Sequence, residues 1–272
     1  MAIEYAAKYS GKVDERFALA SKTNNGVNND YEFTGVDTVK VYSIPTVALG
    51  DYATTGTNRY GTPEELQNAA QTMLLSQDKA FTFIIDKKSE DDTEGAMQAG
   101  KALRRQVDEV IIPTVDKYRL AAMAAGAGKT ATAAISASNA FSSLLDGANA
   151  LSEAGVPETG RVAYVSPNFY KNIHLDGNFV KSGDLSQEMM ARGIMGTVAG
   201  VQIVMVPTTY LPTNVEFIME HPAAVVSPIK LESYKIHDNP PGINGKLVEG
   251  RIRYDAFVLD SKKNAVYVHK NA

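Results

Sequence analysis

The sequence has no cysteine among its 272 residues, so disulfide bonds, thiolate metal sites and cysteine nucleophiles are excluded. Basic charge is also scarce: 27 lysines and arginines stand against 31 acidic residues, and the formal net charge is −4. Proteins that hold nucleic acid through its phosphates need clustered positive charge. We therefore expect no surface that holds nucleic acid through its phosphates.

Long hydrophobic runs are missing as well. The N-terminal stretch MAIEYAAKYSGKVDERF carries charges throughout, unlike a signal peptide. No window approaches the roughly 20 apolar residues of a membrane span. These absences predict a protein made in the cytosol without a membrane partner. The composition, 44% hydrophobic and 21% charged, is ordinary for a globular chain of one large or two modest domains.

The stretch AAGAGKTATA, residues 124–133, resembles the end of a nucleotide-binding loop. That loop needs G-x-x-x-x-G-K-[ST] between a strand and a helix. Here the position of the first glycine is Met123, and a long predicted helix precedes the motif. A helix C-terminus presents negative dipole charge, which disfavours phosphate. We interpret Gly128, Lys129 and Thr130 as a flexible connector, and keep a degenerate nucleotide-binding α/β enzyme only as the least favoured alternative.

Other catalytic and metal motifs are not apparent in the sequence. No H-x-x-x-H or H-E-x-x-H pair signals zinc, and no G-x-S-x-G elbow signals an acyl-transfer serine. The acidic SEDDTE, residues 89–94, is typical of a solvated helix start. We therefore expect a protein that is not an enzyme, with no catalytic residue, cofactor or metal ion. The histidines, which are far apart in the sequence, are His174, His221, His237 and His269.

The N-terminal residues 1 to about 22 predict an amphipathic helix. Four apolar residues are spaced by four and fall on one stripe: Tyr5, Tyr9, Val13 and Phe17. The polar stretch SKTNNGVNND then ends the pattern. Because the sequence offers this stripe no adjacent core, we expect it to pack against the rest of the chain or against a neighbouring molecule.

An extended hairpin is predicted next. TVKVYSIPTVAL, residues 38–49, and KAFTFIIDK, residues 79–87, have strand composition, and Pro45 suits an edge strand. The long connection between them has few large apolar side chains near its tip, mainly Tyr52 and Tyr60. Such a hairpin has little core of its own. We expect it to lie across another molecule.

A long helix is predicted from about Asp92 to Ala125, with apolar residues at helical spacing. At 1.5 Å per residue it would measure roughly 50 Å, several times the average helix. Pro113 should kink it. Residues 138–155 predict a second amphipathic helix, closed by Gly155 and followed by a proline.

The remaining chain divides into two patterns. Strand and helix alternate from RVAYVSP through NFYKNIHLD and GVQIVMVPTTYLP to VEFIMEHPAAVVSP, as in an α/β unit. The C-terminal stretches IKLESYKIH, KLVEGRIRYDAFVLD and AVYVHK predict an antiparallel meander. Within it, DSKKN, residues 260–264, predicts a hairpin tip, and DNPPGING, residues 238–245, a turn-dense loop.

The order of these elements resembles the Hong Kong 97 fold of tailed-bacteriophage major capsid proteins, in a branch seen in phages of Gram-positive hosts. The similarity covers nearly the whole chain. The stretches that carry it are KYSGKVDERF, VDTVKVYSIPTVALGDY, NRYGTPEEL, GKALRRQVDEVIIPTVDKYR, GVQIVMVPTTYLP and KIHDNPPGINGKLVEGRIRYDAFVL.

The resemblance implies an α+β fold with five segments. These are an N-arm (1–40), an extended hairpin called the E-loop (41–85), a spine helix of the P-domain (86–130), an α/β A-domain (131–225) and P-domain strands (226–272). The loop HDNPPGING would lie where three capsomers meet.

The resemblance also implies contacts between subunits. We expect them at Tyr5, Tyr9, Val13, Phe17, Asp51, Tyr52, Arg59, Tyr60, Glu64, Glu65, His237, Asp238, Asn239, Pro240, Pro241 and Asn244.

The partners implied are copies of the same chain, as hexamers and pentamers of a shell, together with a portal protein and, in some members, a decoration protein. Because the arm begins at Met1, a separate scaffolding protein is expected. No lysine occurs between Lys40 and Lys79, so isopeptide cross-linking from the hairpin tip is not expected. The shell would enclose double-stranded DNA without reading its sequence. We expect the protein in the virion, assembled in the host bacterial cytoplasm.

The nearest alternative is an encapsulin, a cellular compartment shell with the same fold. An amphipathic N-terminal helix suits it too, because encapsulins bind cargo peptides with their N-terminal region. The stretches quoted above favour the phage capsid.

Overall fold

A computed structural model of the chain divides into two compact units. We call them the body, which comprises 1–32 and 75–272, and the hairpin unit, which comprises 33–74. The structure describes residues 21–28, 38–43, 47–63, 65, 69–88, 99–176, 194–198 and 200–272. Within these ranges, no helix combines the length and the apolar character needed to cross a membrane.

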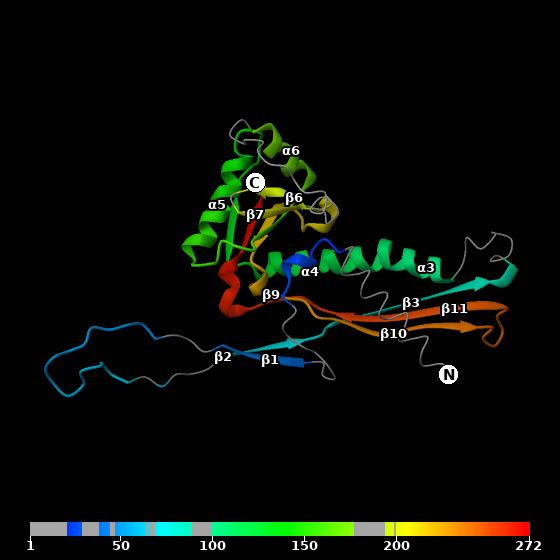
Figure 1. Ribbon diagram of the computed structural model, residues 1–272, viewed down its shortest axis with the longest axis horizontal. Coiled ribbons are helices and arrows are strands. Elements are labelled where there is room, and N and C mark those ends of the chain that lie inside the picture. The colour runs from blue at the N-terminus through cyan, green and yellow to red at the C-terminus, as the bar shows by residue number, and fades with distance from the viewer. Residues whose placement is uncertain are drawn as a thin grey trace. The chain divides into compact units, whose positions relative to one another are not determined.

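The larger sheet of the body has six strands in the order β4-β13-β8-β5-β7-β6. Strands β6 and β7 of this sheet are labelled in Figure 1. Strands β5 and β7 are parallel, as are β13 and β4, and the other neighbours are antiparallel. Every residue of β5 is buried, as expected for a central strand covered on both faces. The strands are β4 (Lys129–Thr132), β5 (Val162–Val165), β6 (Ile194–Val198), β7 (Val201–Met205), β8 (Val215–Glu220) and β13 (Val266–Lys270).

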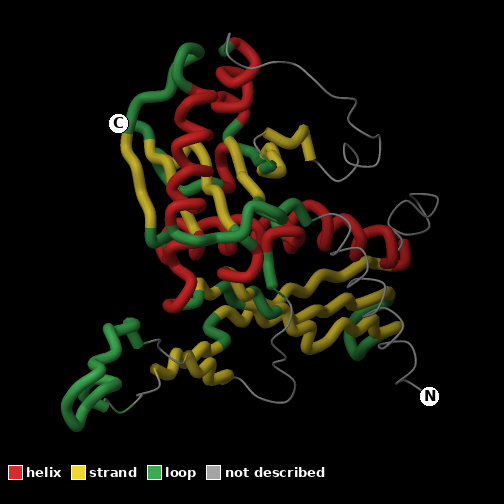
Figure 2. Tube along the Cα trace, turned by 60° about the vertical axis from the view of Figure 1, so that its left-hand side comes forward, coloured by secondary structure: helices red, strands yellow, loops and turns green. Residues whose placement is uncertain are grey.

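Helices cover both faces of this sheet, as the red helices beside the yellow strands in Figure 2 show. Helices α5 (Ala140–Glu153) and α6 (Pro167–Leu175) pack on one face. Leu120 and Met123 of helix α4 (Ile112–Gly126) pack on the other. The two resulting apolar clusters make this sheet the centre of the core.

Local signals fix the ends of α5 and α6. Gly155 follows α5 with φ 72°, a conformation that glycine adopts without strain. Its N–H bonds the carbonyl of Ser152, and the next N–H, of Val156, bonds that of Leu151, which closes the helix. Helix α6 begins where the Ser166 hydroxyl accepts a hydrogen bond from a backbone N–H at 3.0 Å. The end of α5 at Gly155 was predicted from the sequence, and α6 was predicted as a helix within NFYKNIHLD.

A second sheet of three antiparallel strands has the order β10-β11-β3 (Figure 1). The strands are β3 (Gln77–Asp86), β10 (Ile229–Asp238) and β11 (Gly245–Tyr254). Its inner face packs on the long helix. Gly250 in β11 is essential there, because an added Cβ would lie 2.4 Å from the Phe81 ring and 2.6 Å from the Tyr234 ring. The two aromatic rings fill the space that a side chain would take.

The long helix runs from Ala99 to Gly126, about 40 Å at 1.5 Å per residue. It consists of α3 (Ala99–Gln106), a π-helical turn (Val107–Ile111) and α4. The π turn ends two residues before Pro113, where the sequence predicted a kink. Its predicted start at Asp92 lies outside the described residues.

The C-terminal meander was predicted only in part. Strands β10 and β11 form the expected hairpin, but β13 leaves it and inserts between β4 and β8 in the larger sheet. Residues Asp260–Ala265 form a 3₁₀ helix, so the predicted hairpin tip is wrong. The physical reason is that successive residues of β13 are apolar, and burying both faces requires a central position in a covered sheet.

The predicted flexible connector is also wrong. Residues Lys129–Thr132 form strand β4, which pairs in parallel with β13. Gly128 is needed for close packing and not for flexibility, because an added Cβ would lie 2.7 Å from the backbone carbonyl of Lys263. The Gly128 N–H donates to that carbonyl at 2.8 Å. The prediction that a helix precedes the motif is confirmed.

In the hairpin unit, β1 (Thr38–Ser43) pairs antiparallel with β2 (Ala69–Leu74). The expected partner of the first strand was the stretch at 79–87, but β3, which contains most of it, belongs to the smaller sheet of the body. Strand β2 was missed because alanine and glutamine have low strand propensity. Pro45 lies outside the described residues.

Two further short strands of the body pair with each other: β9 (Val225–Val226) and β12 (Phe257–Val258). The remaining short helices are 3₁₀ turns at Asn24–Gly26, Thr208–Tyr210 and Pro222–Ala224.

Candidate assembly surfaces

Large hydrophobic side chains are exposed mainly on the hairpin unit. Nine are exposed among the residues described, and six of them belong to this unit: Tyr42, Val47, Leu49, Tyr52, Tyr60 and Leu74. The unit is a two-stranded ribbon with a long loop, which cannot cover these side chains from within. Contiguous exposed apolar surface marks sites of protein–protein contact. We call the exposed residues 47–63 the loop surface.

The loop surface has a defined shape at its tip. The Tyr52 and Tyr60 rings meet edge to face with centroids 5.0 Å apart. Across the loop, the Ala53 N–H donates to the Arg59 carbonyl at 3.0 Å, and the Arg59 side chain donates to the Gly56 carbonyl at 3.1 Å. These bonds hold the two rings together as one exposed apolar pair. Predicted contact residues Asp51 and Glu65 are also exposed, and Glu64 lies outside the described residues.

The turn between β10 and β11 gathers the second group of predicted contact residues. Asn239 adopts φ 48°, and its side-chain oxygen accepts a hydrogen bond from the Gly245 N–H at 3.1 Å. The carbonyl of Asn244 accepts from the backbone of Lys87 at 2.9 Å. An added Cβ on Gly245 would meet the carbonyl of Ile85, so this strand start requires glycine. The turn is thereby tied to the end of β3.

The predicted residues of this turn project to solvent. Asp238, Asn239, Pro241 and Asn244 are exposed, and Pro240 is half-buried. His237 is exposed as well, with its ring Nε2 3.1 Å from Glu249 on the adjacent strand. The Tyr5, Tyr9, Val13 and Phe17 stripe lies outside the described residues.

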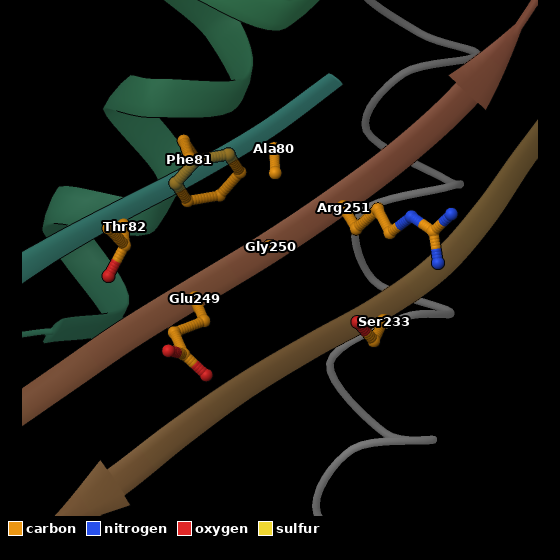
Figure 3. A pocket seen from close by; sticks show the side chains of 7 residues that line it. All are labelled: Ala80, Phe81, Thr82, Ser233, Glu249, Gly250 and Arg251. Atoms are coloured by element: carbon orange, nitrogen blue, oxygen red, sulfur yellow. The ribbon is translucent and has the colours of Figure 1, made fainter. Parts of the chain in front are cut away.

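The outer face of the smaller sheet carries a shallow depression of about 390 Å³ (Figure 3). Glu249 and Arg251 lie on either side of Gly250 on the middle strand, and Ala80 and Ser233 line the depression from the two neighbouring strands. Its shallow, polar character suits contact with another macromolecular surface better than enclosure of a small ligand.

An ion pair adjoins this depression. The Arg251 guanidinium donates to both carboxylate oxygens of Asp78 at 2.9 and 2.5 Å. This hydrogen bonding lowers the pKa of Asp78, and the charge of Arg253 acts in the same direction. Among the described residues, no group of three or more metal-ligating side chains is present.

Three of the histidines have structural contacts. The His221 ring accepts a hydrogen bond from the Ala223 N–H at 3.2 Å, His174 contacts Tyr170, and His269 stacks on Phe217. The contacts account for their positions without catalysis. Lys129 is exposed on β4, and the motif around it does not form the strand–loop–helix cradle that phosphate binding needs.

A buried polar cluster in the body was not predicted from the sequence. It contains Thr23, Asp116, Arg119 and Glu220, each at most 1% exposed. A signal was present: Asp116 and Arg119 lie on the otherwise apolar, buried side of the long helix. Charged residues at such positions are almost never fully buried unless paired.

Burial changes the protonation of this cluster. It raises the pKa of Glu220 well above its ordinary value, and the nearby charge of Arg119 opposes this only in part. Burial also raises the pKa of the Tyr164 hydroxyl and lowers that of Arg119. The cluster therefore places Asp116 and Arg119 together with Glu220, whose charged form is disfavoured by burial.

Comparison with known proteins identifies the fold. No protein-family model matches the sequence, and no curated protein matches it. Among solved structures, a chain from Mycobacterium phage Che8 superposes with a TM-score of 0.73 at 19% identity, covering 92% of this chain and 90% of that one. The head structure of Helicobacter pylori bacteriophage KHP40 matches with a TM-score of 0.67 at 10% identity over 93% and 90%.

A virus-like particle from Pyrococcus furiosus matches with a TM-score of 0.59 at 12% identity, over 98% of this chain and 100% of that one. The body and hairpin unit together therefore have the fold of phage capsid proteins. The Hong Kong 97 fold predicted from the sequence is confirmed: helices and sheets are mixed, and a long helix spans the smaller sheet.

Proposed function

We propose that the chain is a major capsid protein of a tailed bacteriophage. Copies assemble as hexamers and pentamers into an icosahedral shell around double-stranded DNA. The observation that carries this proposal is the concentration of exposed large hydrophobic side chains on the hairpin unit, within a fold shared with phage heads. Such a surface is completed by another subunit.

The segments take the roles that the family resemblance implies. Residues 1–40 are the N-arm, 41–85 the E-loop, 86–130 the spine helix, 131–225 the A-domain and 226–272 the P-domain strands. The pairing of β3 with β11 supports a refined end of the E-loop at Leu74, because β3 is part of the body.

The partners follow from this role. A portal protein and a separate scaffolding protein would act in assembly in the host cytoplasm, and a decoration protein would bind the outside. The net charge of −4 supports a wall that does not condense DNA. The role requires no enzymatic activity, cofactor or metal ion.

A second candidate is an encapsulin-type compartment shell. The full-length match to the Pyrococcus furiosus virus-like particle favours it. The two functions differ in what the shell encloses, a genome in one case and enzyme cargo in the other.

Electron microscopy of the purified protein tests both proposals. We expect closed shells of uniform size, and a protein that stays monomeric at high concentration would contradict any shell function. Particles recovered from the native host then separate the candidates. DNA and a portal would support the phage capsid, and packaged enzyme would support the encapsulin.

A further inference from the structure

Residues 21–28 connect the N-terminal segment to the body and are held mainly by polar contacts. The stretch SKTNNGVN contains one large apolar residue, Val27, which joins the core beside α4. One buried valine provides little hydrophobic anchoring. We call residues 21–28 the root.

Asp116 binds three donors of the root. Its Oδ1 accepts hydrogen bonds from the hydroxyls of Ser21 and Thr23, each at 2.6 Å. Its Oδ2 accepts one from the backbone N–H of Lys22 at 3.0 Å. Hydrogen bonds to a carboxylate are stronger than those between neutral groups. Because Asp116 is 1% exposed, water does not compete for these positions.

Arg119, one turn further along the same helix, binds the root from the other side. Its Nη1 donates to Thr23 Oγ1 at 3.1 Å and to Ser21 Oγ at 3.4 Å. Its Nε donates to Ser227 Oγ at 2.7 Å, which links the helix to the C-terminal part of the body. The Thr23 hydroxyl is therefore held between a buried anion and a buried cation.

The other residues of the root also contact the body closely. An added Cβ on Gly26 would lie 2.0 Å from the Tyr164 hydroxyl and 2.1 Å from the Glu220 carboxyl, so this position accepts only glycine. The backbone of Asn28 bonds the Val225 carbonyl at 2.7 Å. The side chain of Lys22 donates to the Met205 carbonyl at 3.0 Å.

We propose that Asp116 and Arg119 form a clamp that fixes the base of the N-terminal arm on the long helix and so positions the arm for contact with neighbouring subunits. This inference rests on the proposed shell function. Directional bonds suit the task, because they specify one position of the root where a single valine would allow several. Asp116 and Arg119 act as positioning residues.

The double variant Ser21→Ala/Thr23→Val removes the root hydroxyls and nearly keeps its shape. We expect backbone hydrogen exchange in residues 22–28 to become at least tenfold faster and the yield of shells to fall several-fold. Ser227→Ala is the matched control, because it removes a hydroxyl from Arg119 but none from the root. It should leave root exchange and shell yield close to wild type. Its melting temperature should change by about as much as that of the double variant.

Unchanged root exchange in the double variant would overturn the clamp, as would faster exchange with a normal shell yield. If the double variant does not fold, Ser21→Ala alone, which removes the bonds of this hydroxyl to Asp116 and Arg119 but keeps those of Thr23, should still accelerate root exchange about threefold. Failure of the wild-type protein to form shells would count against the proposed function. Root exchange measured on the unassembled protein would still decide whether the clamp exists.

Discussion

In the body, three clusters of buried side chains fill the space between sheets and helices, whereas the described residues of the hairpin unit leave six large hydrophobic side chains in solvent. The body is longer and has two covered sheets, so it can bury apolar surface by itself. The hairpin unit is a two-stranded ribbon without that capacity. Stability should therefore depend on the body and assembly on the hairpin unit.

The largest effect is expected from removal of the loop tip. Replacing residues 51–62 by a short glycine–serine linker should abolish shells, because the Tyr52–Tyr60 pair is lost. The melting temperature of the unassembled protein should not change, since these residues are exposed. Electron microscopy and thermal melts measure the two outcomes. The control is Thr54→Ser with Thr57→Ser, which keeps loop length and rings, and normal shells from the shortened protein would refute the assignment.

A leucine-to-alanine substitution in the body and one in the hairpin unit should affect different properties. Leu151→Ala, at a fully buried position of α5, should lower the free energy of unfolding by about 2–5 kcal/mol. Leu49→Ala, at a fully exposed position, should leave it unchanged and reduce the yield of shells. Denaturant unfolding of the unassembled protein provides the comparison. Equal destabilisation by both substitutions would contradict the division of roles.

A smaller, pH-dependent effect is expected at Glu220. Burial raises its pKa in the folded state. The stability linked to this proton is complete below the unfolded pKa and is lost as pH rises toward the folded pKa. Glu220→Gln should therefore gain stability over wild type as pH increases from 5 to 8, reaching about 1–3 kcal/mol. A pH-independent difference in stability between Glu220→Gln and wild type would argue against the raised pKa of Glu220.

The smallest effect is expected on the exposed side of the long helix. Arg105 donates to Glu109 at 2.9 and 3.1 Å, but the two side chains are 77% and 58% exposed. Solvent screens such a pair. Arg105→Ala should leave the melting temperature unchanged within error. A clear decrease would show that this surface of the body is more than a solvated face.

Local patterns allowed much of the fold to be predicted. Helices α5 and α6, the long helix and strands β3, β5, β8, β10 and β11 all follow from periodicity, caps and turn residues. The positions of β4 and β13 did not follow, because pairing partners far apart in the sequence leave no local signal. Strand β2 was missed because its composition has low strand propensity, so only its pairing with β1 shows that it is a strand.

The two exposed candidate surfaces were predicted from the sequence, but the buried clamp was not. The loop surface and the β10–β11 turn came from the family resemblance and from turn chemistry, and the structure shows both exposed. The clamp was missed, although Asp116 and Arg119 stand out on an apolar helix face. A charge at such a position shows that a partner is needed, but only the folded chain shows that the partner is a segment about 95 residues away in sequence.

The sequence by itself determined most of the helices and strands, including the long helix, the absence of thiol chemistry and the resemblance to capsid proteins. These depend on neighbouring residues or on composition. The tertiary structure alone decided that β13 belongs to the larger sheet, that the lysine motif forms strand β4, and that hydrogen bonds to Asp116 and Arg119 hold the root. Each of these features depends on contacts between segments that are distant in the sequence. Such contacts form only in the folded chain, so no local pattern in the sequence signals them.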